Sequence, residues 1–135
     1  MTSKWNGQPC DLCGQGALHD GIKTITQQYK GQTFTSESRG AFCDHCNDGI
    51  LEYDEAEELA WIAFRDQVDA EEAAELVRIR KKLRLTQLEA AKIAGGGKNA
   101  FSRYERGQAK PVAAVVNLFK ILDRHPELLL ELGSR

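Results

Sequence analysis

The sequence of 135 residues predicts an α+β protein built from two small modules: an N-terminal metal-binding α/β module and a C-terminal all-α domain of about five helices. Two Cys-x-x-Cys pairs lie in the first fifty residues, and helical periodicity dominates from residue 54 onward. The charge divides as well, because residues 1–77 carry 5 basic and 15 acidic side chains, whereas residues 78–110 carry 10 and 2. We therefore expect one module at residues 1–68 and the other at residues 69–135.

The cysteine pairs, Cys10-Asp-Leu-Cys13 and Cys43-Asp-His-Cys46, predict a four-thiolate metal site. A gap of two residues lets one tight turn aim both sulfurs at a common point, and two such turns complete a tetrahedron. Zinc is the favoured ion, and iron in a rubredoxin-like site is the minor alternative. Four sulfur ligands leave no open position, so the metal is expected to be structural. We expect His45 to be a knuckle residue and not a ligand.

The segment between the pairs predicts a β-hairpin. Ile22–Ile25 and Tyr29 precede Gly31, and a polar alternation around Phe34 leads to Arg39-Gly40, so glycines stand at the bends. A segment this short cannot bury enough apolar surface to fold by itself. We expect the metal to supply much of its stability.

The connector after the second pair predicts a helix of about three turns that begins at Asp54, with Glu57 completing the cap. Its large apolar side chains either pack against the metal module, which is the favoured interpretation, or form a docking surface for a partner helix; they are Leu59, Trp61, Ile62, Phe64 and Val68. A second capping pattern, Asp69-Ala-Glu-Glu72, predicts that a new helix begins there, with the module boundary near Gln67–Ala70.

Residues 78–110, which we call the basic block, begin within that second helix. The helix should end near Arg84-Leu85. Thr86-Gln-Leu-Glu89 is a capping box that starts a short helix, and Gly95-Gly-Gly97 stops it. The glycine run is followed by Lys98, but a helix precedes it and no Ser or Thr follows the lysine. We therefore reject a phosphate-binding P-loop.

A third helix is predicted from Lys98 to Arg106, and its pairing with the preceding helix across a glycine turn indicates a helix-turn-helix. Asn99 and Arg103 are the base-contact candidates, because Asn pairs with adenine and Arg with guanine. The candidates for phosphate contacts are Lys81, Lys82, Lys98, Ser102 and Arg106. The alternative is that Asn99 is only a helix cap and Arg103 only a surface residue.

Two further helices are predicted after Pro111. The first carries closely spaced apolar residues from Val112 to Leu122 and can close a small helical core. The last begins at Pro126 and contains Leu128–Leu130 and Leu132. Three consecutive leucines cannot all face one side, so some apolar surface is expected to be exposed in a monomer and covered in a symmetric homodimer.

Taken together, the chain resembles the MqsA (YgiT-type) family of antitoxins of bacterial type II toxin–antitoxin systems. The resemblance rests on Gly95–Glu105, Lys81–Leu83, Leu85–Gln87, the cysteine pairs and His125–Leu129. The helix-turn-helix alone would match the broader Xre class of repressors. The resemblance implies a homodimer joined through the C-terminal domain that binds a palindrome in its own promoter, with Asn99 and Arg103 reading bases. It also implies that the zinc domain neutralises an mRNA-cleaving ribonuclease toxin.

We therefore expect an antitoxin and autorepressor. The alternative is a stand-alone zinc-containing transcriptional regulator without a toxin partner. We expect no enzymatic activity, since no catalytic triad, carboxylate pair or open metal site is evident. The first residues lack a basic region leading into an apolar stretch, and no apolar run reaches membrane-spanning length, so a cytoplasmic, nucleoid-associated protein is expected.

Overall fold

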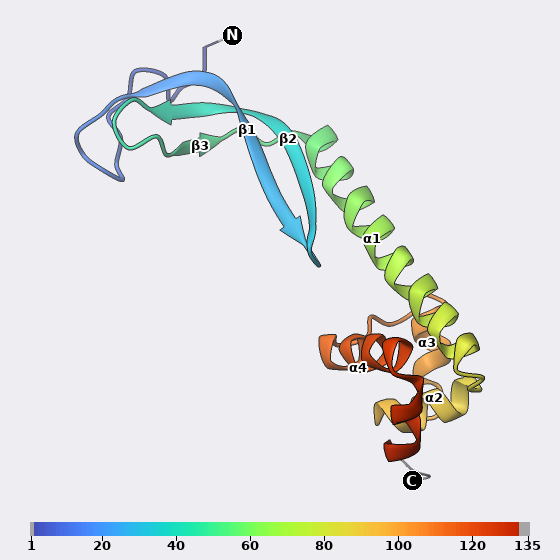
Figure 1. The fold of residues 1–135 in the computed structure, drawn as a ribbon. Coiled ribbons are helices and arrows are strands. Elements are labelled where there is room, and N and C mark those ends of the chain that lie inside the picture. The colour runs from blue at the N-terminus through green and yellow to red at the C-terminus, as the bar shows by residue number, and fades with distance from the viewer. Residues whose placement is uncertain (1, 133–135) are drawn as a thin grey trace. The chain divides into compact units, whose positions relative to one another are not determined.

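The computed structural model describes residues 2–132, and the chain divides into two compact units, Met1–Arg65 and Asp66–Arg135. The elements confirm the predicted α+β class (Figure 1). In chain order they are β1 (Leu18–Tyr29), β2 (Gln32–Cys43), β3 (Gly49–Leu51), α1 (Glu55–Lys82), α2 (Gln87–Ala94), α3 (Ala100–Glu105), α4 (Ala113–Arg124) and the 3-10 helix η1 (Pro126–Leu132). Within residues 2–132 no helix combines the length and apolar character needed to cross a membrane.

The first unit contains a three-stranded antiparallel sheet in the order β1-β2-β3. The predicted hairpin is confirmed, and each of its strands is twelve residues long because pairing continues from Tyr29↔Gln32 to Leu18↔Cys43. The turn consists of Lys30 and Gly31, both with positive φ (50° and 81°), which suits the right-handed twist of a two-residue hairpin. The strands thereby carry the chain directly from one cysteine pair to the other.

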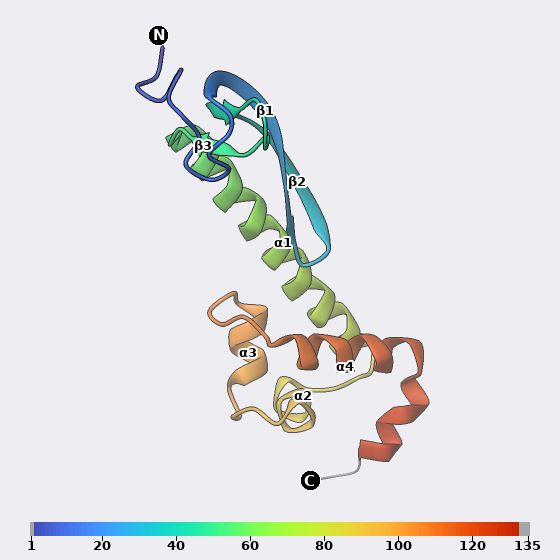
Figure 2. The same ribbon diagram turned by 90° about the vertical axis from the view of Figure 1, so that its left-hand side faces the viewer.

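The first half of α1 lies beside the hairpin (Figure 2). Its capping residue is Asp54, whose Oδ1 accepts a hydrogen bond from the Ala56 N–H at 2.9 Å. Trp61 and Phe64 pack on Phe34, with ring centroids 5.5 and 5.1 Å from that ring. The favoured packing interpretation is therefore right for these aromatic residues. It is wrong for Leu59 and Ile62, which are exposed.

The predicted start of a new helix at Asp69 is also wrong, because α1 runs without a break from Glu55 to Lys82. Asp69 does not cap a new helix; its carboxylate pairs with the Lys110 ammonium at 3.0 Å. No glycine or proline occurs between residues 55 and 82, so nothing in the local chemistry interrupts the backbone hydrogen bonds.

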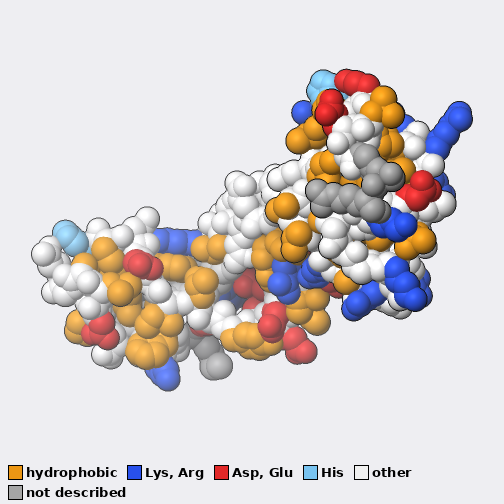
Figure 3. All heavy atoms as spheres, turned by 90° about the horizontal axis from the view of Figure 1, so that it is seen from below, with side chains coloured by type: hydrophobic (Ala, Val, Ile, Leu, Met, Phe, Trp, Pro, Cys, Tyr) orange, Lys and Arg blue, Asp and Glu red, His pale blue; other side chains and the backbone are white. Residues whose placement is uncertain are grey.

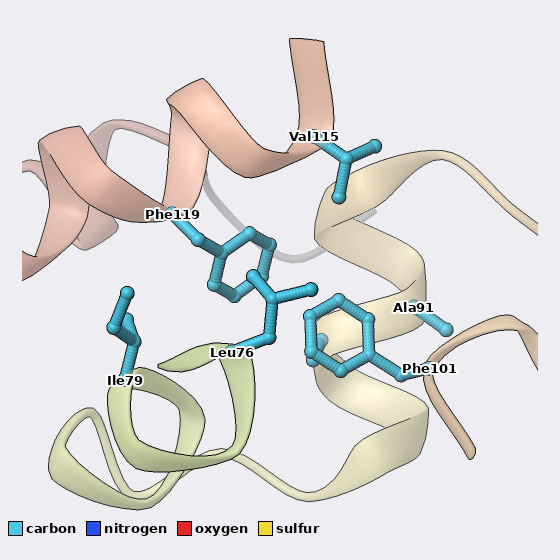
Figure 4. Packing of buried hydrophobic residues seen from close by; sticks show 7 residues of the cluster. Leu76, Ile79, Ala91, Phe101, Val115 and Phe119 are labelled. Atoms are coloured by element: carbon cyan, nitrogen blue, oxygen red, sulfur yellow. The ribbon is translucent and has the colours of Figure 1, made fainter. Parts of the chain in front are cut away.

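The second unit is a helical core that the end of α1 forms with α2, α3 and α4 (Figure 4). Phe101 of α3 and Phe119 of α4 are fully buried, with ring centroids 4.8 Å apart, and Leu76 and Ile79 of α1 pack against them. The predicted capping box of α2 is confirmed: the Glu89 N–H donates to Thr86 Oγ1 at 3.1 Å. The small side chains of Ala90 and Ala91 let α2 pack closely in the core. The helix ends at Gly95, which has a left-handed conformation.

Candidate metal centre and nucleic-acid interface

The four cysteine sulfurs lie within 4.8 Å of one another and are positioned to hold a metal ion. Cys10 Sγ is 3.7 Å from Cys46 Sγ, and Cys13 Sγ is 3.6 Å from Cys43 Sγ. A tetrahedral ion with metal–sulfur bonds of ~2.3 Å has sulfurs about 3.8 Å apart. Two of the sulfur pairs therefore already have the separation that a four-thiolate ion requires, and none of the cysteines is in a disulfide.

The two pairs share one local backbone design. The residue after each second cysteine is in the left-handed region: Gly14 has φ 68° and Asn47 has φ 66°. In the second pair the N–H groups of His45 and Cys46 donate to Cys43 Sγ at 3.3 and 3.4 Å. The structure thus places the His45 backbone at the knuckle and leaves its side chain exposed.

Contacts between the two turns hold the pairs in place, and sequence reasoning did not identify them. A Cβ atom at Gly16 would lie 2.5 Å from Cys43 Sγ, so only glycine fits there. Asp44 accepts hydrogen bonds from the Ala17 N–H at 3.1 Å and from His19 at 2.9 Å. The His19 bond and then the Ala17 bond hold the pKa of Asp44 below its ordinary value. The register of β1 on β2 brings these residues together.

The pKa values of Cys13 and Cys46 are shifted in opposite directions. The backbone N–H of Gln15, aided by that of Gly16, lowers the pKa of Cys13 to about 6. At Cys46 a hydrogen bond from the Asp48 backbone lowers the pKa, but burial and the three neighbouring thiols outweigh it and raise the pKa to about 12. A metal ion binds the thiolate form of its cysteine ligands, so a bound dication would favour loss of the Cys46 proton.

On the second unit, the predicted third helix is shorter than expected. The segment Lys98–Arg106 contains α3 only at Ala100–Glu105, with Asn99 at the N-cap position. The Asn99 side chain makes no capping hydrogen bond and is exposed. Arg103 lies one turn further and is exposed too, and its guanidinium has no polar partner among residues 2–132. Both base-contact candidates are therefore available to a ligand.

The phosphate-contact candidates differ in availability. Lys81, Lys98 and Arg106 are exposed and Ser102 is half-buried. Lys82 is engaged, since its Nζ donates to the Asp123 backbone oxygen at 2.7 Å and to Asp123 Oδ1 at 2.9 Å. Figure 3 shows lysine and arginine side chains on the surface of this unit.

A polar network that sequence reasoning missed fixes α3 to α1 and α2. Glu105 accepts hydrogen bonds from Arg80 Nε at 2.6 Å, Arg80 Nη2 at 3.0 Å and Gln87 Nε2 at 3.2 Å, and Arg80 Nη1 donates to the Leu85 oxygen at 2.9 Å. The Arg80 side chain is 14% exposed and that of Glu105 is 8% exposed. Of the two acidic residues among residues 78–110, Glu105 is thus buried in this network and Glu89 caps α2 at the surface. The outer charge of the block is correspondingly basic.

Known proteins match nearly the whole chain. The family model described as the antitoxin component of a bacterial toxin–antitoxin system, MqsA, matches residues 8–133. The antitoxin MqsA of Escherichia coli (strain K12) is 44% identical over 128 residues, which cover 91% of this chain and 98% of that protein. Both cysteine pairs and the segment from α2 to η1 lie inside the matched range.

Proposed function

The chain belongs to the MqsA family of antitoxins, and on this premise we propose that it neutralises a cognate mRNA-cleaving ribonuclease toxin and represses its own operon by binding palindromic promoter DNA. Membership of the family supports a non-enzymatic regulatory role. The observation that carries the proposal is the extent of the match, since residues 8–133 include both the metal module and the helices that follow it. We assign toxin binding to residues 1–68, and DNA binding and dimerisation to residues 69–135.

The proposed metal is a structural zinc ion held by Cys10, Cys13, Cys43 and Cys46. The spacing of the sulfurs supports this choice, and a site filled by four thiolates has no position for a substrate. When bound, the ion supplies a cross-link between two turns 30 residues apart in the chain. The ion would therefore stabilise the fold of the module and would not take part in a reaction.

For DNA, we propose that Asn99 and Arg103 contact bases while Lys81, Lys98, Ser102 and Arg106 contact phosphates. The exposure of Asn99 and Arg103 and the absence of a capping bond from Asn99 support this assignment. Lys82, which the sequence also suggests for phosphate, would have to leave Asp123 to reach one.

We also propose a homodimer, because a palindrome needs a symmetric reader. Exposed Ile121, Leu128 and Leu130 on α4 and η1 support an interface in the C-terminal unit. Analytical ultracentrifugation of the full chain should give a dimer. A monomer at micromolar concentration would contradict this part of the proposal.

The test of the antitoxin function uses the small protein encoded beside this gene. Expressed alone, that protein should stop growth and degrade mRNA, and co-expression with the full chain should restore growth and yield a stable complex. If it is harmless alone or does not bind, the chain is a stand-alone zinc-containing helix-turn-helix regulator. In that case mild zinc chelation is the next measurement, because a metal sensor would lose operator binding whereas a structural metal would leave it.

A further inference from the structure

We propose that the toxin covers the outer face of the first half of α1, defined here as Glu55, Glu58, Leu59 and Ile62. This inference rests on the proposed function and names the surface that would perform it. It concerns the first unit only. The evidence is that one face of this half-helix packs on the hairpin while the opposite face is exposed, and that acidic residues lie beside the exposed face.

The inner face of this half-helix is occupied by the hairpin. Trp61 and Phe64 pack on Phe34, Trp61 also meets the edge of Tyr29, and Ser38 donates a hydrogen bond to Glu57 at 3.1 Å. At 3.6 residues per turn, these positions share one side of the helix. The inner face therefore has its partner within the same unit.

The outer face is apolar at its centre and has no such cover. The spacing of Glu55, Glu58, Leu59 and Ile62 at three and four residues puts them together on the side opposite Phe64. Leu59 is 58% exposed and Ile62 is 37% exposed. Large aliphatic side chains in a row on a helix are the usual anchors of helix-mediated recognition.

The N-terminal end of this face is acidic. Residues 40–64 contain no lysine or arginine but seven acidic residues: Asp44, Asp48, Glu52, Asp54, Glu55, Glu57 and Glu58. Glu58 accepts a hydrogen bond from the Tyr53 hydroxyl at 2.6 Å, which holds that carboxylate at the edge of the face. The charge at this end of the face is therefore negative, whereas Arg65, one turn after Ile62, lies over the Trp61 ring at 5.5 Å from its centroid.

A face of this kind selects for a cationic protein. The same face of a second copy would place carboxylates against carboxylates, and nucleic acid would be repelled. A ribonuclease must bind the phosphates of RNA and therefore presents lysine and arginine around its substrate site. Its basic surface complements the acidic flank, and the aliphatic centre supplies the dry contact that holds the complex together.

The experiment uses the full-length, metal-loaded chain and the purified protein encoded beside its gene as the probe. The double variant Leu59→Ala/Ile62→Ala should weaken binding by about tenfold or more, mainly through faster dissociation. The matched control is Ile22→Ala on β1, because Ile22 is 56% exposed in the same unit but lies outside the acidic stretch. This variant should bind within about twofold of the unaltered chain.

A second variant tests the charge. Glu55→Gln should slow association and make its rate less sensitive to salt, with dissociation unchanged, because a rim carboxylate acts by steering. Metal content and operator affinity should remain those of the unaltered chain in every variant, which shows that both units are folded.

The possible outcomes distinguish an error in the proposed toxin-binding face from an error in the proposed antitoxin function. Full affinity of the Leu59→Ala/Ile62→Ala variant, or a loss confined to Ile22→Ala, overturns the proposed surface while the toxin partnership stands. Failure of the unaltered chain to bind the probe overturns the proposed function, and this inference with it.

Discussion

The substitution Glu105→Gln should strongly destabilise the C-terminal unit. It preserves the shape of the side chain but removes its charge, so Arg80, whose side chain is only 14% exposed, loses its counter-ion. Removing one partner of a buried ion pair costs about 3–5 kcal/mol. The guanidinium keeps its bond to the Leu85 oxygen, so we take the lower end, about 3 kcal/mol. For a unit of about 70 residues with an unfolding entropy of about 2.1 cal/mol/K per residue, this corresponds to a decrease in Tm of about 20 °C.

The assay is thermal unfolding of the metal-loaded full chain followed by circular dichroism. The matched control is Arg78→Ala, which breaks an exposed cluster in which Arg78 pairs with Glu75 and Asp123. Exposed pairs contribute little, so its shift in Tm should be a small fraction of that of Glu105→Gln. Equal shifts for the two variants would refute the reasoning, since they would show that burial of the Arg80–Glu105 pair is energetically irrelevant.

A double variant separates the desolvation penalty from the loss of attraction. Arg80→Met/Glu105→Leu removes both charges and keeps apolar volume, so it should recover most of the lost stability. If it is as unstable as Glu105→Gln, the network stabilises the unit through its hydrogen bonds and not by neutralising a buried charge.

Three further outcomes are expected. Zinc binding near pH 7 should release at least one proton and fewer than four, because Cys13 has a pKa of about 6 and Cys46 has a pKa of about 12. Calorimetry in buffers of different ionisation enthalpy measures the number of protons released. Arg103→Ala should abolish preference for the operator over random DNA, whereas Lys81→Ala should weaken both alike and reduce the salt slope by about one in filter binding. Arg78 and Lys82 lower the pKa of Asp123 to about 2, so its stabilising contribution is present above its unfolded pKa of about 4 and lost toward pH 2, and Asp123→Asn should flatten acid unfolding there.

The sequence by itself determined the features that depend on residues close together in the chain. The spacing of each cysteine pair places two sulfurs at one turn, the Thr86–Glu89 box starts α2, and Gly95 stops it. Lys30-Gly31 closes the hairpin in the same way. These signals are readable because each involves residues no more than four positions apart, and no distant part of the chain can easily reverse them.

Only the tertiary structure decided which of the remaining side chains are free and which are engaged. Arg80 is paired with Glu105, 25 positions away, and Lys82, a phosphate-contact candidate from the sequence, is bound by Asp123, 41 positions away. Likewise, helical spacing groups Leu59 with Ile62 but does not say whether the hairpin covers them. Such pairings depend on how the elements pack, and apolar periodicity specifies a face without specifying its partner.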